Sequence, residues 1–116
     1  VDETKQALAA FMRRDWTIIK QWQRTAQSQL RGTVFQVAVW KAMCQIPAGK
    51  VVTYQELATQ IGRAGAARAV GTACGANPFP FLIPCHRVVA QHGIGGYGYG
   101  VELKQQLLQF ESLPHT

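Results

Sequence analysis

The sequence predicts one mostly helical domain with a few short β elements, and two observations lead to this fold class. Apolar residues recur at helical spacing in several separate stretches, and proline or glycine follows most of them. Only two short runs, Val51-Val52 and residues 81–89, read as extended chain. The 116 residues suffice for one domain with a core, and 47% hydrophobic against 16% charged residues fits a compact fold.

The first 30 residues are expected to form a helical extension and a linker, ahead of a domain over residues 31–116. Apolar residues near helical spacing, from Leu8 to Trp22, predict a single helix over residues 2–24. Asp15 interrupts the apolar face of this helix. The polar run 25–29 predicts the linker.

Two capping boxes mark the starts of the next helices. Thr33 and Gln36 have the spacing of such a box, and the helix that they open should end at the turn Pro47-Ala48-Gly49. Thr53 and Glu56 repeat the pattern after the short extended run. A helix is therefore expected to begin at each threonine.

The helix after Thr53 should end at Gly62, and a second helix-competent segment follows at residues 64–75. This segment is almost wholly Ala and Gly, with Arg68 and Val70 the sizeable side chains before Cys74. Two short helices joined by a tight turn are typical of a helix-turn-helix, whose second helix enters a groove of DNA. With the short β elements, this pattern favours a winged helix-turn-helix-like domain.

Charge and cysteine usage narrow the class of protein. The net charge of +6 favours a polyanionic partner, since basic side chains near phosphates release counterions. No secretion signal or membrane span is seen, so we expect a cytoplasmic location, or whichever compartment holds the nucleic acid. Cys44, Cys74 and Cys85 fit free thiols, and with the histidines they lack the paired spacing of a zinc site.

The run Pro84-Cys85-His86-Arg87 carries the chemistry. It places a thiol beside two basic residues, which lower the pKa of a thiol from about 8.5; a buried, inert cysteine is the alternative. In an extended run neighbouring side chains point to opposite faces, so His86 would reach the sulfur through a water. Glu111, on the apolar stripe of a last helix over residues 101–112, is expected to orient the imidazole, and a solvated position in a frayed last turn is the alternative.

The segment from Pro84 to Val89 resembles the active-site motif of the O6-alkylguanine-DNA alkyltransferases, also called methylated-DNA-protein-cysteine methyltransferases. The resemblance runs from about Gly32 to Glu111 and includes further motifs in the family's order: Gly32-Thr33-Val34-Phe35-Gln36, Ile46-Pro47-Ala48-Gly49, Val52-Thr53-Tyr54, Arg68-Ala69-Val70-Gly71 and Asn77-Pro78. It implies DNA repair by one irreversible transfer of an alkyl group from O6-alkylguanine, with O4-alkylthymine as a further candidate, to the protein's own cysteine. The implied partner is double-stranded DNA, bound in the minor groove with the nucleotide flipped out, by a monomer that needs no cofactor.

The resemblance also implies a role for each matched residue. Cys85 would be the nucleophile and alkyl acceptor, and His86 with Glu111 would take the thiol proton. Tyr54 would protonate N3 of the leaving guanine, and Asn77 would brace a turn. The implied DNA-binding residues are Thr53, Tyr54, Ala67, Arg68, Ala69 and Gly71, with Arg68 filling the stack that the flipped nucleotide vacates. The implied substrate pocket consists of Pro80, Ile83, Val88, Tyr97, Gly98 and Tyr99.

Departures from the family's pattern modify these expectations. About 30 residues stand in place of the N-terminal domain of longer members, so we expect no metal and no zinc site of that domain. Bulky Tyr99, where some members carry glycine, predicts that methyl is accepted more readily than benzyl-sized groups. Two other classes remain as alternatives: a non-catalytic lesion-binding protein, like the alkyltransferase-like proteins that carry Trp instead of the acceptor cysteine, and a winged-helix regulator, which would need neither Cys85 nor a carboxylate on an apolar stripe.

Overall fold

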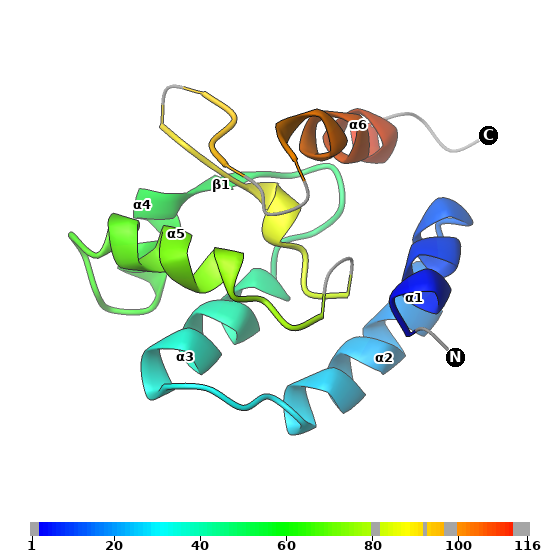
Figure 1. Cartoon of the computed structure of the whole chain (residues 1–116), viewed down its shortest axis with the longest axis horizontal. Helices are drawn as coiled ribbons and strands as arrows, with labels where there is room; N and C mark the ends of the chain where they lie inside the picture. The colour runs from blue at the N-terminus through cyan, green and yellow to red at the C-terminus, as the bar shows by residue number, and fades with distance from the viewer. Residues whose placement is uncertain (1–2, 80–81, 92, 97–99, 113–116) are drawn as a thin grey trace.

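The fold is mostly helical, with one two-stranded sheet. A computed structural model of the chain describes residues 3–79, 82–91, 93–96 and 100–112 (Figure 1). Two strands, β1 (Val52–Thr53) and β2 (Val88–Val89), pair in parallel with Val52 opposite Val88. The helical elements are α1 (Glu3–Met12), α2 (Trp16–Ser28), α3 (Val34–Met43), α4 (Tyr54–Gln60), α5 (Ala67–Gly75), the 3-10 turn η1 (Cys85–Arg87) and α6 (Val101–Ser112). The predicted fold class is confirmed.

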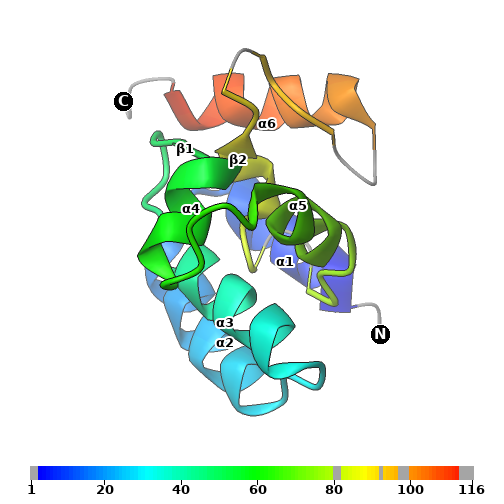
Figure 2. The ribbon, with the colours of Figure 1, turned by 90° about the vertical axis from the view of Figure 1, so that its left-hand side faces the viewer.

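The chain around η1 lies where two apolar clusters meet. In Figure 1, α1 and α2 lie on one side of the molecule, α4 and α5 lie on the other, and α6 lies at the upper right. In Figure 2, turned by 90°, α6 runs along the top. One cluster joins α3, α4 and α5 and includes Ile83, Cys85 and Val88. The other joins α1 and α2 to α6 and includes Leu82. Successive residues before η1 therefore pack into different clusters, which fixes this segment from both sides.

The N-terminal extension contains two helices, so the single helix expected over residues 2–24 is wrong. Arg14 has a φ of 55°, a left-handed conformation that ends α1. The side chain of Asp15 accepts a hydrogen bond from the Ile18 amide at 3.2 Å and caps α2. The helix then continues to Ser28, so the linker expected at residues 25–29 is also wrong. Asp15 starts the second helix rather than interrupting the first.

Both capping boxes form as expected. The side chain of Thr33 accepts from the Gln36 amide at 3.0 Å, and Thr53 accepts from the Glu56 amide at 3.0 Å, with the reciprocal bonds present in each box. The first of these helices ends at Met43, four residues before the expected proline turn, because reverse-turn hydrogen bonds take over the chain after it. The helix expected at residues 64–75 begins at Ala67.

The segment that leads into Cys85 is not the extended run that its apolar sequence predicts. The Cys85 amide donates to the Ile83 carbonyl at 2.8 Å, across Pro84 with φ −81° and ψ 69°, which is an inverse γ-turn. The Arg87 amide then donates to the Pro84 carbonyl at 3.0 Å and closes η1. The fixed φ of proline suits this turn, so the reactive segment coils before β2 begins.

Candidate active site

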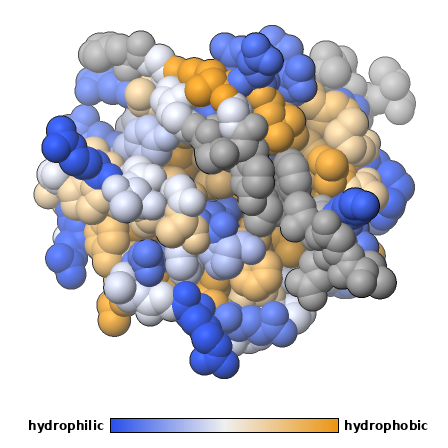
Figure 3. Space-filling model, viewed as in Figure 1, coloured by the Kyte–Doolittle hydropathy of each residue, from blue (hydrophilic) through white to orange (hydrophobic). Residues whose placement is uncertain are grey.

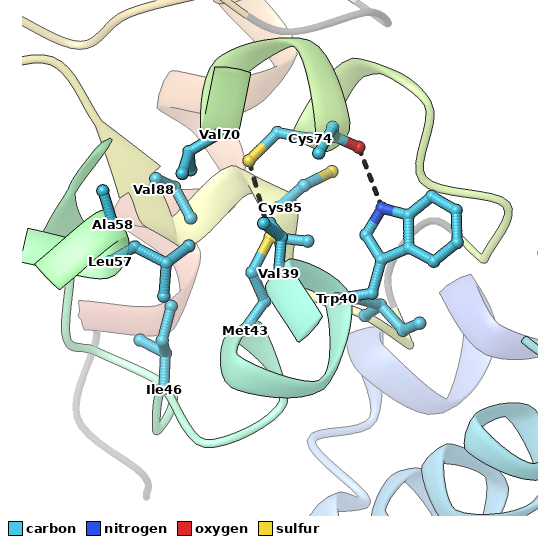
Figure 4. Close-up of a cluster of buried hydrophobic side chains, with 12 residues drawn as sticks. Val39, Trp40, Met43, Ile46, Leu57, Ala58, Val70, Cys74, Cys85 and Val88 are labelled. Atoms are coloured by element: carbon cyan, nitrogen blue, oxygen red, sulfur yellow. Dashed lines mark hydrogen bonds between the residues drawn. The ribbon is translucent and has the colours of Figure 1, made fainter. Parts of the chain in front are cut away.

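Cys85 lines a cavity of about 510 Å³ beside α5. Its side chain is only 7% exposed and lies among the apolar side chains between α3 and α5 (Figure 4). The other residues of the cavity wall come from α4, α5 and the chain after β2: Tyr54, Ala67, Arg68, Gly71, Cys74, Gly75 and Gly96. The cavity therefore brings the thiol together with four residues expected in the DNA-binding set: Tyr54, Ala67, Arg68 and Gly71.

Glu111 accepts hydrogen bonds from both basic residues of η1. His86 Nε2 lies 2.9 Å from Glu111 Oε2, and Arg87 Nε donates to the two carboxylate oxygens at 3.0 and 2.9 Å. Arg87 Nη2 also donates to Oε2, and Nη1 donates to the Ile46 carbonyl at 2.8 Å. All three side chains are buried, so the solvated alternative for Glu111 is wrong and the expected contact with His86 is present.

These contacts determine which nitrogen of His86 is basic. Burial alone would raise the pKa of Glu111, but hydrogen bonds from His86 and Arg87 outweigh burial and hold the pKa below its ordinary value. Burial lowers the pKa of His86, and Glu111 only partly offsets this effect. A neutral imidazole facing an ionised carboxylate carries its proton on Nε2. Nδ1 is then the proton acceptor, and it is buried without a hydrogen-bond partner within the described part of the chain.

The two other thiols are poorly suited to act as nucleophiles. Burial raises the pKa of Cys74 to about 12, and its Sγ lies 3.6 Å from the sulfur of Met43 (Figure 4). Burial also raises the pKa of Cys44. Both thiols therefore stay protonated near neutral pH, and a protonated thiol is a weak nucleophile. Cys74 shares the cavity with Cys85, which makes it an internal control for reactivity.

Lys104 is a site residue that the sequence did not identify. It is fully buried in α6, and its Nζ donates to the carbonyls of Val88 at 2.6 Å and Gly96 at 2.9 Å. The same Nζ lies 5.7 Å from the centre of the Tyr54 ring. Tyr54 donates in turn to the Gly96 carbonyl at 3.4 Å. Gly95 packs closely against the Tyr54 ring, and a Cβ at position 95 would lie 2.9 Å from the Tyr54 hydroxyl.

The second helix of the helix-turn-helix presents small residues and one long cation. Arg68 and Ala69 are exposed in the first turn of α5, and Arg68 also lines the cavity. Strongly hydrophilic residues lie beside pale and light-orange ones over the left part of Figure 3, where Figure 1 places α4 and α5. Of the expected DNA-binding set, Thr53 caps α4, and Ala67 and Gly71 line the cavity wall. A thin helix of this kind allows close approach of a large polymer.

The residues expected to line the substrate pocket divide into two groups. Ile83 and Val88 are fully buried in the cluster that holds Cys85. Pro80, Tyr97, Gly98 and Tyr99 lie outside the described residues. Within the described ranges, no group of three or more His, Cys, Asp or Glu side chains could hold a metal ion.

Asn77 braces the chain before Cys85. Its Nδ2 donates to the Ile83 carbonyl at 2.7 Å, and its Oδ1 accepts from the Phe79 amide at 3.0 Å. Asn77→Ala should lower the free energy of unfolding by about 1–3 kcal/mol, since it removes two hydrogen bonds: one of the two that the Ile83 carbonyl accepts, the other coming from the Cys85 amide, and the one that the Phe79 amide donates. Urea denaturation measures this cost. Asn77→Asp keeps the acceptor and loses the donor, so a cost for Asn77→Asp near zero would contradict the importance of the Ile83 contact.

Fold and site together define a helix-turn-helix domain whose second helix borders a cavity with a thiol, next to a buried His-Glu-Arg group. A family model described as the DNA-binding domain of 6-O-methylguanine DNA methyltransferase matches residues 34–113. A probable methylated-DNA-protein-cysteine methyltransferase of Acanthamoeba polyphaga mimivirus is 52% identical over 83 residues, which are 72% of this chain and 56% of that protein. The chain belongs to the 6-O-methylguanine DNA methyltransferase family.

Two solved structures show the same fold. The Mycobacterium tuberculosis OGT in complex with DNA has a TM-score of 0.70 and 52% identity, over 72% of this chain and 52% of that chain. The S. pombe Atl1 in complex with damaged DNA containing O6-carboxymethylguanine has a TM-score of 0.61 and 32% identity, over 73% of this chain and 82% of Atl1. The chain spans about half the length of the mimivirus relative and of the OGT. No described helix combines the length and apolar character that crossing a membrane requires.

Proposed function

We propose that this chain repairs O6-alkylguanine in double-stranded DNA by transferring the alkyl group irreversibly to its own Cys85. The observation that carries this proposal is the position of the Cys85 thiol in a cavity bordered by the second helix of a helix-turn-helix, next to a neutral histidine held by Glu111. Residues 31–116 would carry both the DNA-binding surface and the active site. The protein would act in the compartment that holds the DNA.

The proposed reaction needs only groups of the chain, the substrate and one water. His86 Nδ1 takes the proton of Cys85 through a water, and the resulting thiolate attacks the alkyl carbon. An S–C bond forms while the C–O6 bond breaks, and its electron pair leaves with the guanine. Tyr54 donates a proton to N3 of this leaving group. The thioether on Cys85 has no comparable leaving group, so each molecule reacts once.

DNA binding would use the small residues of α5 against the minor groove. Arg68, exposed at the start of this helix and at the cavity wall, would occupy the stack that the flipped nucleotide vacates. The net charge of +6 supports contact with phosphates without base-specific readout. Such binding suits a lesion that can occur at any guanine.

Lesion binding without transfer is the second candidate function. It is favoured by the similarity to Atl1, of which this chain spans 82% and whose structure contains damaged DNA. The thiol at Cys85 and the neutral imidazole of the following residue, His86, favour transfer, because binding alone requires neither.

Peptide mass spectrometry distinguishes the two candidates. The chain is incubated with excess duplex DNA that carries one O6-methylguanine, and an identical duplex with guanine is the control. We expect one methyl group on Cys85 with the lesion duplex only, and none on Cys44 or Cys74. Binding of the lesion duplex with no methyl group gained would exclude transfer and leave lesion binding.

A further inference from the structure

The helical pair α1–α2 lies against the buried group formed by His86, Glu111 and Arg87. The ring of Phe11 meets the His86 imidazole edge-on, with centroids 5.6 Å apart and an interplanar angle of 82°. Phe11 and His86 are both fully buried. The Trp16 ring centre lies 6.0 Å from the guanidinium carbon of Arg87. The extension thus places one aromatic ring on each of the two residues that donate to Glu111.

Further contacts fix the extension to the chain on both sides of this group. Arg14 donates to the Phe110 carbonyl at 2.9 Å and lies over the Phe110 ring at 4.4 Å. Gln23 donates to the Leu82 carbonyl at 2.5 Å. Phe110 is the neighbour of Glu111 in α6, and Leu82 precedes η1 by three residues. The helical pair α1–α2 is therefore hydrogen-bonded to the chain next to Glu111 and to the chain just before His86.

We propose that Phe11 and Trp16 are positioning residues, which hold His86 and Arg87 against Glu111 and keep bulk water away from the imidazole. The importance of this role for reactivity rests on the proposed transfer to Cys85. An aromatic ring fills space and excludes water without competing for a hydrogen bond of His86. The charged groups that act on His86 are Glu111 and Lys104 of α6 and Arg87 of η1, and burial lowers its pKa more than Glu111 raises it. Without the Phe11 ring, His86 would spend more time protonated and unable to accept the thiol proton.

The extension α1–α2 shields His86 from solvent completely, but it leaves Arg87 at the edge of a cavity. A second cavity of about 590 Å³ lies between α2 and the chain after α3, and Trp16, Arg87 and Glu111 line it. Arg87 is 6% exposed and His86 is not exposed at all. Substitutions of Phe11 should therefore affect the imidazole more than substitutions of Trp16.

The test uses the full chain with Phe11→Leu, Phe11→Ala and Trp16→Leu. Single-turnover transfer to Cys85 is measured against pH, and the ring nitrogens of His86 are followed by NMR titration. For Phe11→Ala we expect the transfer rate at neutral pH to fall about tenfold, a modest loss of alignment. The His86 titration should move upward and the pH–rate profile with it. Phe11→Leu and Trp16→Leu should show the same directions with smaller changes.

Two matched controls separate positioning from loss of stability. Leu8→Ala removes a partly buried side chain of the same cluster one turn earlier in α1, and Met12→Ala changes the exposed neighbour of Phe11. Equal shifts of the His86 titration in Leu8→Ala and Phe11→Ala would overturn the proposal, as would an unchanged titration and pH profile in Phe11→Ala. If Phe11→Ala does not fold, Phe11→Leu is judged by the same readouts.

The NMR titration also separates this inference from the proposed function. It requires no alkylated DNA and no transfer. A wild-type chain that transfers nothing, while the His86 titration shifts in Phe11→Ala and not in Leu8→Ala, would contradict the proposed transfer and support the positioning of His86.

Discussion

Glu111→Ala is expected to lower the free energy of unfolding by about 3–5 kcal/mol, the range for breaking a buried ion pair by removing one partner. The carboxylate is the acceptor for His86 Nε2 and for Nε and Nη2 of Arg87. Without it, the guanidinium remains buried, and the Ile46 carbonyl is its remaining hydrogen-bond acceptor within the described part of the chain. A domain of this size has a total stability of about 5–15 kcal/mol, so the variant should be marginally folded. Urea denaturation at pH 7 measures the loss.

The matched control for Glu111→Ala lies on the exposed face of the same helix. Gln105→Ala should change the free energy of unfolding by no more than about 0.5 kcal/mol. The double variant Arg87→Met/Glu111→Leu should regain much of the loss, since apolar residues can replace a buried pair at little cost. Its transfer activity should stay low because His86 has lost its acceptor. A cost for Glu111→Ala as small as that for Gln105→Ala would show that the buried contacts do not stabilise the fold.

Local hydrogen bonding made some elements predictable from the sequence. Thr33 and Thr53 each begin a helix because the partner that completes the capping box lies three residues later, within the reach of a local pattern. The boundary between α1 and α2 has no such signal. The left-handed Arg14 is held by Phe110, 96 residues away, so its conformation depends on tertiary packing.

The two buried charged residues of α6 show where site prediction succeeds and where it fails. Glu111 could be predicted because a carboxylate on an apolar stripe requires a donor, and His86 and Arg87 were visible candidates. Lys104 lies on the same face, seven residues earlier, yet lysine commonly runs along apolar surface with its ammonium in water. Its acceptors are two backbone carbonyls, which any residue type provides, so no sequence pattern reveals them.

Cys85→Ser is expected to lower the rate of alkyl transfer by a factor of about 10³ or more, as loss of a nucleophile does in other enzymes. A serine hydroxyl keeps nearly the shape of the thiol but is far harder to deprotonate, so His86 cannot generate an effective nucleophile from it. Mass spectrometry after incubation with the O6-methylguanine duplex measures the rate. Cys44→Ala and Cys74→Ala should retain transfer, because burial already holds both thiols in their protonated form.

The same Cys85→Ser variant separates binding from chemistry, because its complex with the lesion duplex can reach equilibrium without being consumed. Its affinity for this duplex should stay within a factor of about ten of the unreacted wild type, which corresponds to 1.4 kcal/mol. Arg68 and the small residues of α5 are unchanged in the variant, and they form the proposed DNA surface. Loss of both binding and transfer would indicate that the substitution disturbs the cavity. Loss of transfer with binding intact would assign the chemistry to the thiol, while undiminished transfer would require a different acceptor.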